Sequence, residues 1–125
     1  MSKYSIAGLG VTKQGIIPNT SADQLTWDAI ELALADAGIE RRSVNGYVFQ
    51  PGFGEPVSGN GAGRAGLGAH STLEINSSGA TANLALSAAI GLIDSGTAEY
   101  VMCTHATNAR SQKVTVGAET SPPRL

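Results

Sequence analysis

The chain has 125 residues, of which 42% are hydrophobic, and this length suits one globular domain or one part of a larger protein. Eight basic and ten acidic residues give a formal charge of -2 without a basic cluster, which argues against nucleic-acid binding. Only 14% of the residues are charged, against roughly 25% in average soluble proteins, so we expect the chain to bury much of its surface against something else.

The single cysteine, Cys103, excludes an internal disulfide and favours a cytoplasmic location. The first residues hold one positive charge and no long apolar run, so we expect no signal peptide. The most apolar stretch is too short and too rich in alanine to predict a membrane span.

The first part of the chain predicts a strand, a helix and a second strand. Residues 4–11 form a short apolar run that ends in a glycine turn, which indicates a buried strand. Ser21 opens a capping-box pattern, so we expect a helix from about Ala22 to Ala37, ended by Gly38. Residues 44–50 are apolar and partly aromatic and predict the second strand.

A glycine-rich loop follows from Pro51 to Ala69, and a loop of this length tends to be functional or disordered. Inside it, Gly61 to Gly66 matches the Gly-x-Gly-x-x-Gly dinucleotide pattern by letter. No predicted strand leads into this pattern, and no acidic residue lies about twenty positions further on in a matching unit. A flexible loop is therefore the favoured interpretation, and a nucleotide-binding module is a weak alternative.

The rest of the chain predicts a strand, a helix, a strand and a tail. Residues 71–76 alternate apolar and polar side chains, which indicates a half-exposed strand. Residues 79–95 read as one helix with almost no polar side, so we expect it to be buried at the centre of the fold. Residues 98–104 predict a fourth strand, and 105–125 a polar tail. Strands that alternate with helices predict an α/β fold with a parallel, mostly parallel or mixed sheet.

The start of the helix over 79–95 is the first candidate site. Ser77 and Ser78 are candidate N-caps, and Gly96 is a candidate C-cap. Free N–H groups and the positive end of a helix dipole can hold an anion or a developing oxyanion.

Several short motifs, none sufficient alone, have an order and spacing that resemble the thiolase superfamily, and they cover about residues 4–104. The branch that they resemble most is the lipid-transfer or sterol-carrier-protein-x type of thiolase, with its related acyl-CoA aldolases. The motifs are Ile6–Lys13, Ala33–Gly38, Val44–Gly46, Leu67–Gly68, Ile93–Gly96 and Glu99–Met102.

The resemblance implies a specific change at the site. Thiolases have a nucleophilic cysteine at the start of the central helix, seventeen positions before a glycine that here is Gly96, and Gly79 stands at that position. Glycine cannot form an acyl-thioester, so thiolase chemistry through this residue is excluded and no catalytic residue can be named. The resemblance implies carbon–carbon bond cleavage or formation on a CoA thioester, as in an aldolase, without a covalently bound cofactor. Ser78, Gly79 and Thr81 are candidate substrate-binding residues, although capping by Ser78 and packing by Thr81 are the simpler interpretations.

Three other side chains have possible chemistry. Cys103 and His105 are two apart on a predicted strand and could form a thiol–imidazole pair, but a small buried cysteine is the simpler interpretation. His70 follows a glycine loop and reads as a surface residue. Neither histidine has further ligands nearby in sequence, so we expect no metal site.

The resemblance covers only the N-terminal half of a thiolase-like fold. We therefore expect this chain alone to lack turnover and to leave the central helix and one sheet face uncovered. The family implies a homodimer through the strand Ser71–Asn76, and a separate zinc-ribbon and oligonucleotide-fold protein that carries the acyl-CoA. The alternative function is a non-catalytic scaffold or assembly subunit, which the missing thiol also fits.

Overall fold

The computed structural model describes residues 3–51, 57 and 61–109. Residues 110–125 of the predicted polar tail and residues 52–56 and 58–60 of the predicted glycine-rich loop lie outside these residues. Among the described residues, three α-helices and three strands follow one another with two short 3-10 helices between them. They are α1 (Ala22–Ala37), η1 (Arg41–Ser43), β1 (Gly46–Phe49), α2 (Gly61–Arg64), β2 (Ser71–Glu74), η2 (Ser78–Ala80), α3 (Thr81–Asp94) and β3 (Val101–Thr104).

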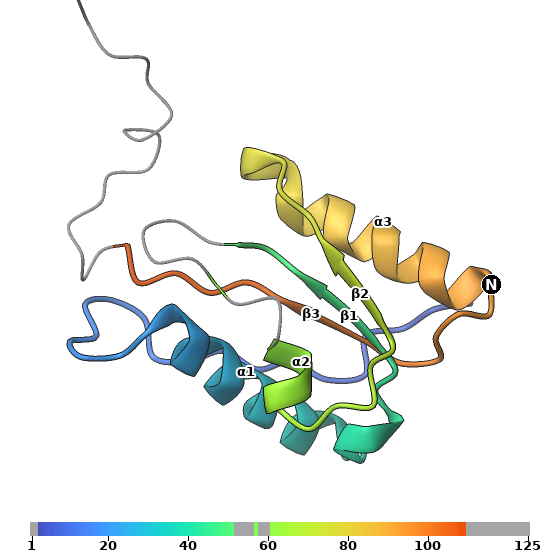
Figure 1. The fold of residues 1–125 in the computed structure, drawn as a ribbon, viewed down its shortest axis with the longest axis horizontal. Coiled ribbons are helices and arrows are strands. Elements are labelled where there is room, and N and C mark those ends of the chain that lie inside the picture. Colours follow the sequence, from blue (N-terminus) through green and yellow to red (C-terminus); the bar gives the residue numbers. More distant parts are fainter. Residues whose placement is uncertain (1–2, 52–56, 58–60, 110–125) are drawn as a thin grey trace, which may run out of the picture.

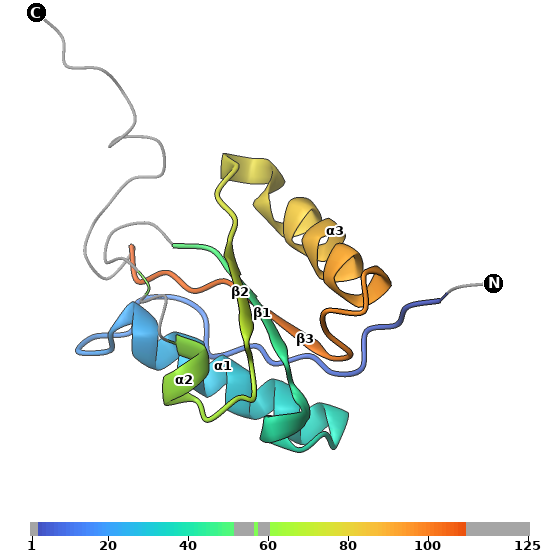
Figure 2. The same ribbon diagram turned by 45° about the vertical axis from the view of Figure 1, so that its right-hand side comes forward.

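The three strands form one parallel sheet in the order β2-β1-β3. In this register Phe49 of β1 stands beside Glu74 of β2 and Thr104 of β3, so the carboxyl ends of all three strands meet at one edge. Helix α3 covers one face of the sheet, and α1 with α2 lies on the other (Figures 1 and 2). The predicted α/β fold with a parallel sheet and helices against it is therefore confirmed.

Helix α1 has the predicted bounds because its two ends are set locally. The hydroxyl of Ser21 accepts a hydrogen bond of 3.0 Å from the Gln24 N–H. Gly38 ends the helix with a φ of 66°, where its N–H bonds to the Leu34 carbonyl. The buried side of α1 and the aromatic side chains of β1 form the core, in which Ile30 and Tyr47 have no exposed surface.

The predicted first strand, over residues 4–11, is not a strand in the structure. Instead this segment lies against α1, where its glycines permit backbone contact. A Cβ atom added to Gly8 would be 2.6 Å from the Ala33 carbonyl oxygen, and one added to Gly10 would be 2.2 Å from that of Ala29. The prediction was wrong because a strand needs a paired neighbour, and the part of the chain that the structure describes provides none for this segment.

Helix α3 forms within the predicted range, and it is uncovered on one side, as expected for this chain alone, rather than buried all round. Only Thr81 and Ala89 are buried, whereas Leu84, Leu86 and Ile90 are exposed by 44%, 47% and 39%. The helix packs one side on β1 and β3, and no described element lies on its other side. None of the helices within the described residues is long and apolar enough to cross a membrane.

Candidate functional site

The loop from β2 into α3 forms a tight turn that Thr81 closes. Its hydroxyl accepts a hydrogen bond of 2.9 Å from the Ser77 N–H and donates one of 2.8 Å to the Ser78 carbonyl. The Thr81 side chain is buried, whereas Ser78 is exposed and has a φ of 49°, in the left-handed region that non-glycine residues seldom adopt. Thr81 thus fixes the conformation of this turn, in agreement with its simpler, structural interpretation.

No side chain caps α3, so the prediction that Ser77 or Ser78 caps the helix is wrong. The 3-10 turn η2 replaces the cap, because the N–H groups of Ala80 and Thr81 already bond to the carbonyls of Ser77 and Ser78. At the other end Ser95 is the C-cap, and Gly96, which was predicted to be the cap, follows it with a φ of 75°.

Gly79 lies in the middle of η2, exposed at the start of α3. A Cβ atom added there would meet nothing within 4 Å, and its φ is not one that favours glycine. Neither backbone strain nor crowding within the described residues therefore requires a glycine at this position. What Gly79 provides is open space beside an exposed N–H that has no partner among the described residues.

Cys103 and His105 do not form a pair in the structure. The Cys103 thiol lies 3.9 Å from the Ala85 carbonyl oxygen, on the side of the sheet that α3 covers. The simpler interpretation, a small buried cysteine, is also wrong, because Cys103 is exposed. Helix α3 covers this face of the sheet only in part. Desolvation nevertheless raises the pKa of the Cys103 thiol and lowers the pKa of the His105 imidazole. Both shifts favour the neutral form, so neither group is activated by the other.

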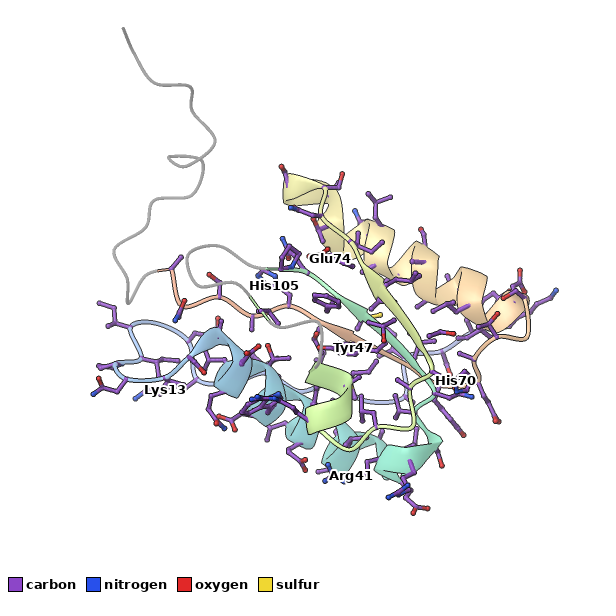
Figure 3. All side chains as sticks on the ribbon, viewed as in Figure 1. Lys13, Arg41, Tyr47, His70, Glu74 and His105 are labelled. Carbon is purple, nitrogen blue, oxygen red and sulfur yellow. The ribbon has the colours of Figure 1, made fainter. Side chains whose placement is uncertain are left out.

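The two histidines lie at opposite ends of the sheet. His70 is exposed just before β2, as predicted, and its N–H bonds to the Asn45 carbonyl, whereas His105 follows β3 (Figure 3). Across residues 3–51, 57 and 61–109, no group of three or more His, Cys, Asp or Glu side chains could hold a metal ion.

The glycine pattern at Gly61 to Gly66 has a packing explanation. Its first residues form the short helix α2, so the prediction of a flexible loop is wrong for them. A Cβ atom added to Gly61 would be 3.0 Å from the Tyr47 hydroxyl oxygen, so glycine here lets α2 lie on the buried tyrosine. The Tyr47 hydroxyl is itself 2.9 Å from the Thr104 hydroxyl, which ties β1 to the end of β3.

One hollow was not predicted from the sequence. A cavity of about 460 Å³ lies between the loop that follows the N-terminal segment, α1 and the residues after β3. Its lining includes Lys13 and His105, but Lys13 lies at the outer end of its loop, well apart from His105 (Figure 3). The predicted candidates Ser78, Gly79 and Thr81 do not line it. The only signal in the sequence was the glycine turn after residues 4–11.

Comparison with known proteins gives matches among solved structures only. No family model matches the chain, and no curated protein does. A solved structure described as "Ltp2-ChsH2(DUF35) aldolase" matches with a TM-score of 0.77 and 31% sequence identity over 91% of this chain. The match covers only 30% of the other chain, so this chain resembles part of that aldolase and spans less than a third of its matched subunit.

Proposed function

We propose that the chain is the N-terminal part of a thiolase-like acyl-CoA enzyme that breaks or forms a carbon–carbon bond on a CoA thioester. The observation that carries this proposal is the match to part of an aldolase over 91% of the chain at 31% identity. The thioester would bind at the start of α3, beside the exposed N–H of Gly79 and the turn that Thr81 closes. Ser78 is exposed at the same turn and could contact the substrate.

The chemistry at this site follows from the absence of a nucleophilic side chain. Without a thiol at Gly79, the acyl group stays on CoA throughout the reaction. In the cleavage direction, a base removes the proton of a β-hydroxyl group, the bond between the α and β carbons breaks, and a carbonyl product leaves. The α carbon then takes a proton as the shortened acyl-CoA forms. Residues outside this chain would supply the base and the acid.

The test is an assay of β-hydroxyacyl-CoA cleavage, with the carbonyl product and the shortened acyl-CoA measured by mass spectrometry. We expect turnover from the protein at its natural length with its bound partners, and none from the 125-residue chain alone. Absence of cleavage by the natural-length protein across short, long and ring-bearing acyl groups would contradict the proposed aldolase activity. A robust rate from the chain alone would contradict the division of the site between this chain and other segments.

The second candidate function is a non-catalytic thiolase-fold scaffold or assembly subunit in the cytoplasm. The exposed apolar side of α3 favours it, because such a face can pack against another subunit as well as against a further part of the same subunit. A homodimer could form through β2, an exposed strand at the edge of the sheet, and an acyl-CoA-binding zinc-ribbon protein is a further possible partner. Native mass spectrometry separates the two functions: a subunit of two to three times this length supports the enzyme, and a 125-residue subunit with a co-purified partner supports the scaffold.

A further inference from the structure

Asn45, directly before β1, connects the three strands of the sheet. Its side-chain Oδ1 accepts hydrogen bonds of 2.8 Å from the Glu99 N–H and 3.2 Å from the Tyr100 N–H. Its main-chain carbonyl accepts a 3.3 Å bond from the His70 N–H, just before β2. Its own N–H and that of Gly46 both donate to the Tyr100 carbonyl, each at 3.1 Å. Asn45 thus ties the start of the central strand to the segments that lead into β2 and β3.

The residue after Asn45 is a glycine for a separate reason. A Cβ atom added to Gly46 would be 3.0 Å from the Ala98 Cβ atom and 3.0 Å from Cγ2 of Val101. The missing side chain therefore lets β1 approach the start of β3 closely. Two independent requirements of the sheet, an acceptor at one position and no side chain at the next, produce an Asn-Gly pair.

An Asn-Gly pair is prone to deamidation, because glycine has no side chain that hinders the approach of its nitrogen. The Gly46 nitrogen attacks Cγ of Asn45, the bond from Cγ to the amide nitrogen breaks, and ammonia leaves with the proton of the Gly46 N–H. A five-membered succinimide ring remains. Water opens this ring to aspartate if the bond from Cγ to the Gly46 nitrogen breaks, or to isoaspartate if the original peptide bond breaks. In isoaspartate the main chain runs through Cγ and is longer by one carbon atom.

The folded sheet restrains both reacting groups. Gly46 is buried and its N–H is bonded to the Tyr100 carbonyl, while Oδ1 of Asn45 is held by two N–H groups. Ring closure requires the Asn45 side chain to turn onto the Gly46 nitrogen, which breaks these hydrogen bonds. The reaction therefore needs a local opening in which the start of β3 separates from β1.

We infer that Asn45–Gly46 is a deamidation site that is closed in the folded sheet and open when the start of β3 leaves β1. The aspartate product fits the sheet, because its carboxylate accepts the same two N–H groups, and a charged acceptor makes stronger hydrogen bonds than an amide. The isoaspartate product does not fit. Its extra carbon atom lies between the main-chain groups that bond to the His70 N–H and the Tyr100 carbonyl, so these bonds cannot form together in the observed register. Isoaspartate here therefore prevents the sheet from forming again.

The first test ages the protein at its natural length and mildly alkaline pH, folded in buffer and unfolded in guanidinium chloride. Peptide mass spectrometry measures deamidation at each asparagine, and circular dichroism checks that the buffer sample is folded. We expect Asn45 to deamidate about 100-fold more slowly in the folded protein. Asn60–Gly61 is the same dipeptide and is the internal reference, since both pairs should react at similar rates in guanidinium chloride. Equal rates for Asn45 in the two conditions would overturn the inference, as would an unreacted Asn45 in guanidinium chloride where Asn60 reacts.

Variants test the fit of the aspartate product. Asn45→Ala should lower the denaturation midpoint by about 0.5 M or more, because the N–H groups of Glu99 and Tyr100 lose their acceptor. Asn45→Asp should keep or raise the midpoint. Asn76→Ala, at an exposed asparagine, is the matched control and should leave it almost unchanged. A midpoint for Asn45→Asp as low as that for Asn45→Ala would contradict the fit of aspartate.

Refolding tests the effect of the isoaspartate product. After ageing in guanidinium chloride, the original protein should lose refolding yield in step with the isoaspartate that forms at Asn45. The Asn45→Asp variant should keep most of its yield, because a carboxylate resists attack by the Gly46 nitrogen, while Asn60 still deamidates in both proteins. Equal losses of yield in the two proteins would show that isoaspartate at this site does not block the sheet.

Discussion

The contact between the N-terminal segment and α1 can be tested through one glycine. In a Gly10→Ala variant the new methyl group would be 2.2 Å from the Ala29 carbonyl oxygen and 2.6 Å from the Ala33 N atom. Both are backbone atoms of a helix interior, so they cannot yield as a flexible side chain would. Overpacking of this kind costs about 1–3 kcal/mol, and we expect a loss of about 2 kcal/mol in the free energy of unfolding.

The sign of this effect is the informative part. At an unstrained position, replacing glycine with alanine stabilises a protein by about 0.4–1 kcal/mol, because the unfolded chain loses freedom. Gly63→Ala is such a control, since its Cβ atom would meet nothing within 4 Å and Gly63 lies in helix α2. Urea denaturation of the 125-residue chain, followed by circular dichroism, should move the Gly10→Ala midpoint down by about 1 M and the Gly63→Ala midpoint slightly up. A Gly10→Ala midpoint equal to that of the original chain would show that the segment does not rest on α1.

Three further predictions concern single side chains. The Gly79→Cys variant should fold with unchanged stability, because its Cβ atom would meet nothing within 4 Å. It should also add a thiol that iodoacetamide labels faster than Cys103. A decrease of more than about 1 kcal/mol in the free energy of unfolding would contradict the open space at this position. Tyr47→Phe should lower the free energy of unfolding by about 1 kcal/mol, because it removes the hydrogen bond to the Thr104 hydroxyl. Tyr100→Phe, at a 38% exposed position, should leave it almost unchanged in the same denaturation assay. Partial desolvation raises the pKa of the Cys103 thiol, so its alkylation in the folded chain should need a higher pH than in urea. Equal pH profiles in the two states would contradict this.

The parts of the fold that the sequence predicted well are those with local signals. Ser21 and Gly38 mark the two ends of α1 within one turn of the helix itself, and both act as predicted. The apolar or alternating stretches that became β1, β2 and β3 are short and bounded, so their positions could be predicted although each observed strand has only four residues. Residues 4–11 also form an apolar run, but such a run becomes a strand only where another strand pairs with it, and the run itself does not show this.

The site was harder to predict because its geometry depends on a turn and not on a pattern. Two serines before an apolar helix predict a side-chain N-cap. In the structure, however, the 3-10 turn at Ser78 already bonds the N–H groups that such a cap would satisfy. Thr81 then has the structural role, through hydrogen bonds to the main chain of Ser77 and Ser78. The space around Gly79 is open because no described residue packs there, and the spacing of residues along the chain cannot predict this.

The exposed side of α3 bears on the proposed function. A helix that is apolar all round needs cover on every side, and this chain covers only the side that lies on β1 and β3. Full burial of a leucine or isoleucine contributes about 1.5–3 kcal/mol, so covering the exposed two-fifths or so of Leu84, Leu86 and Ile90 would add about 2–4 kcal/mol. A layer placed there would stabilise the helix. We expect the segment that supplies the acid and base of the proposed reaction to belong to this layer.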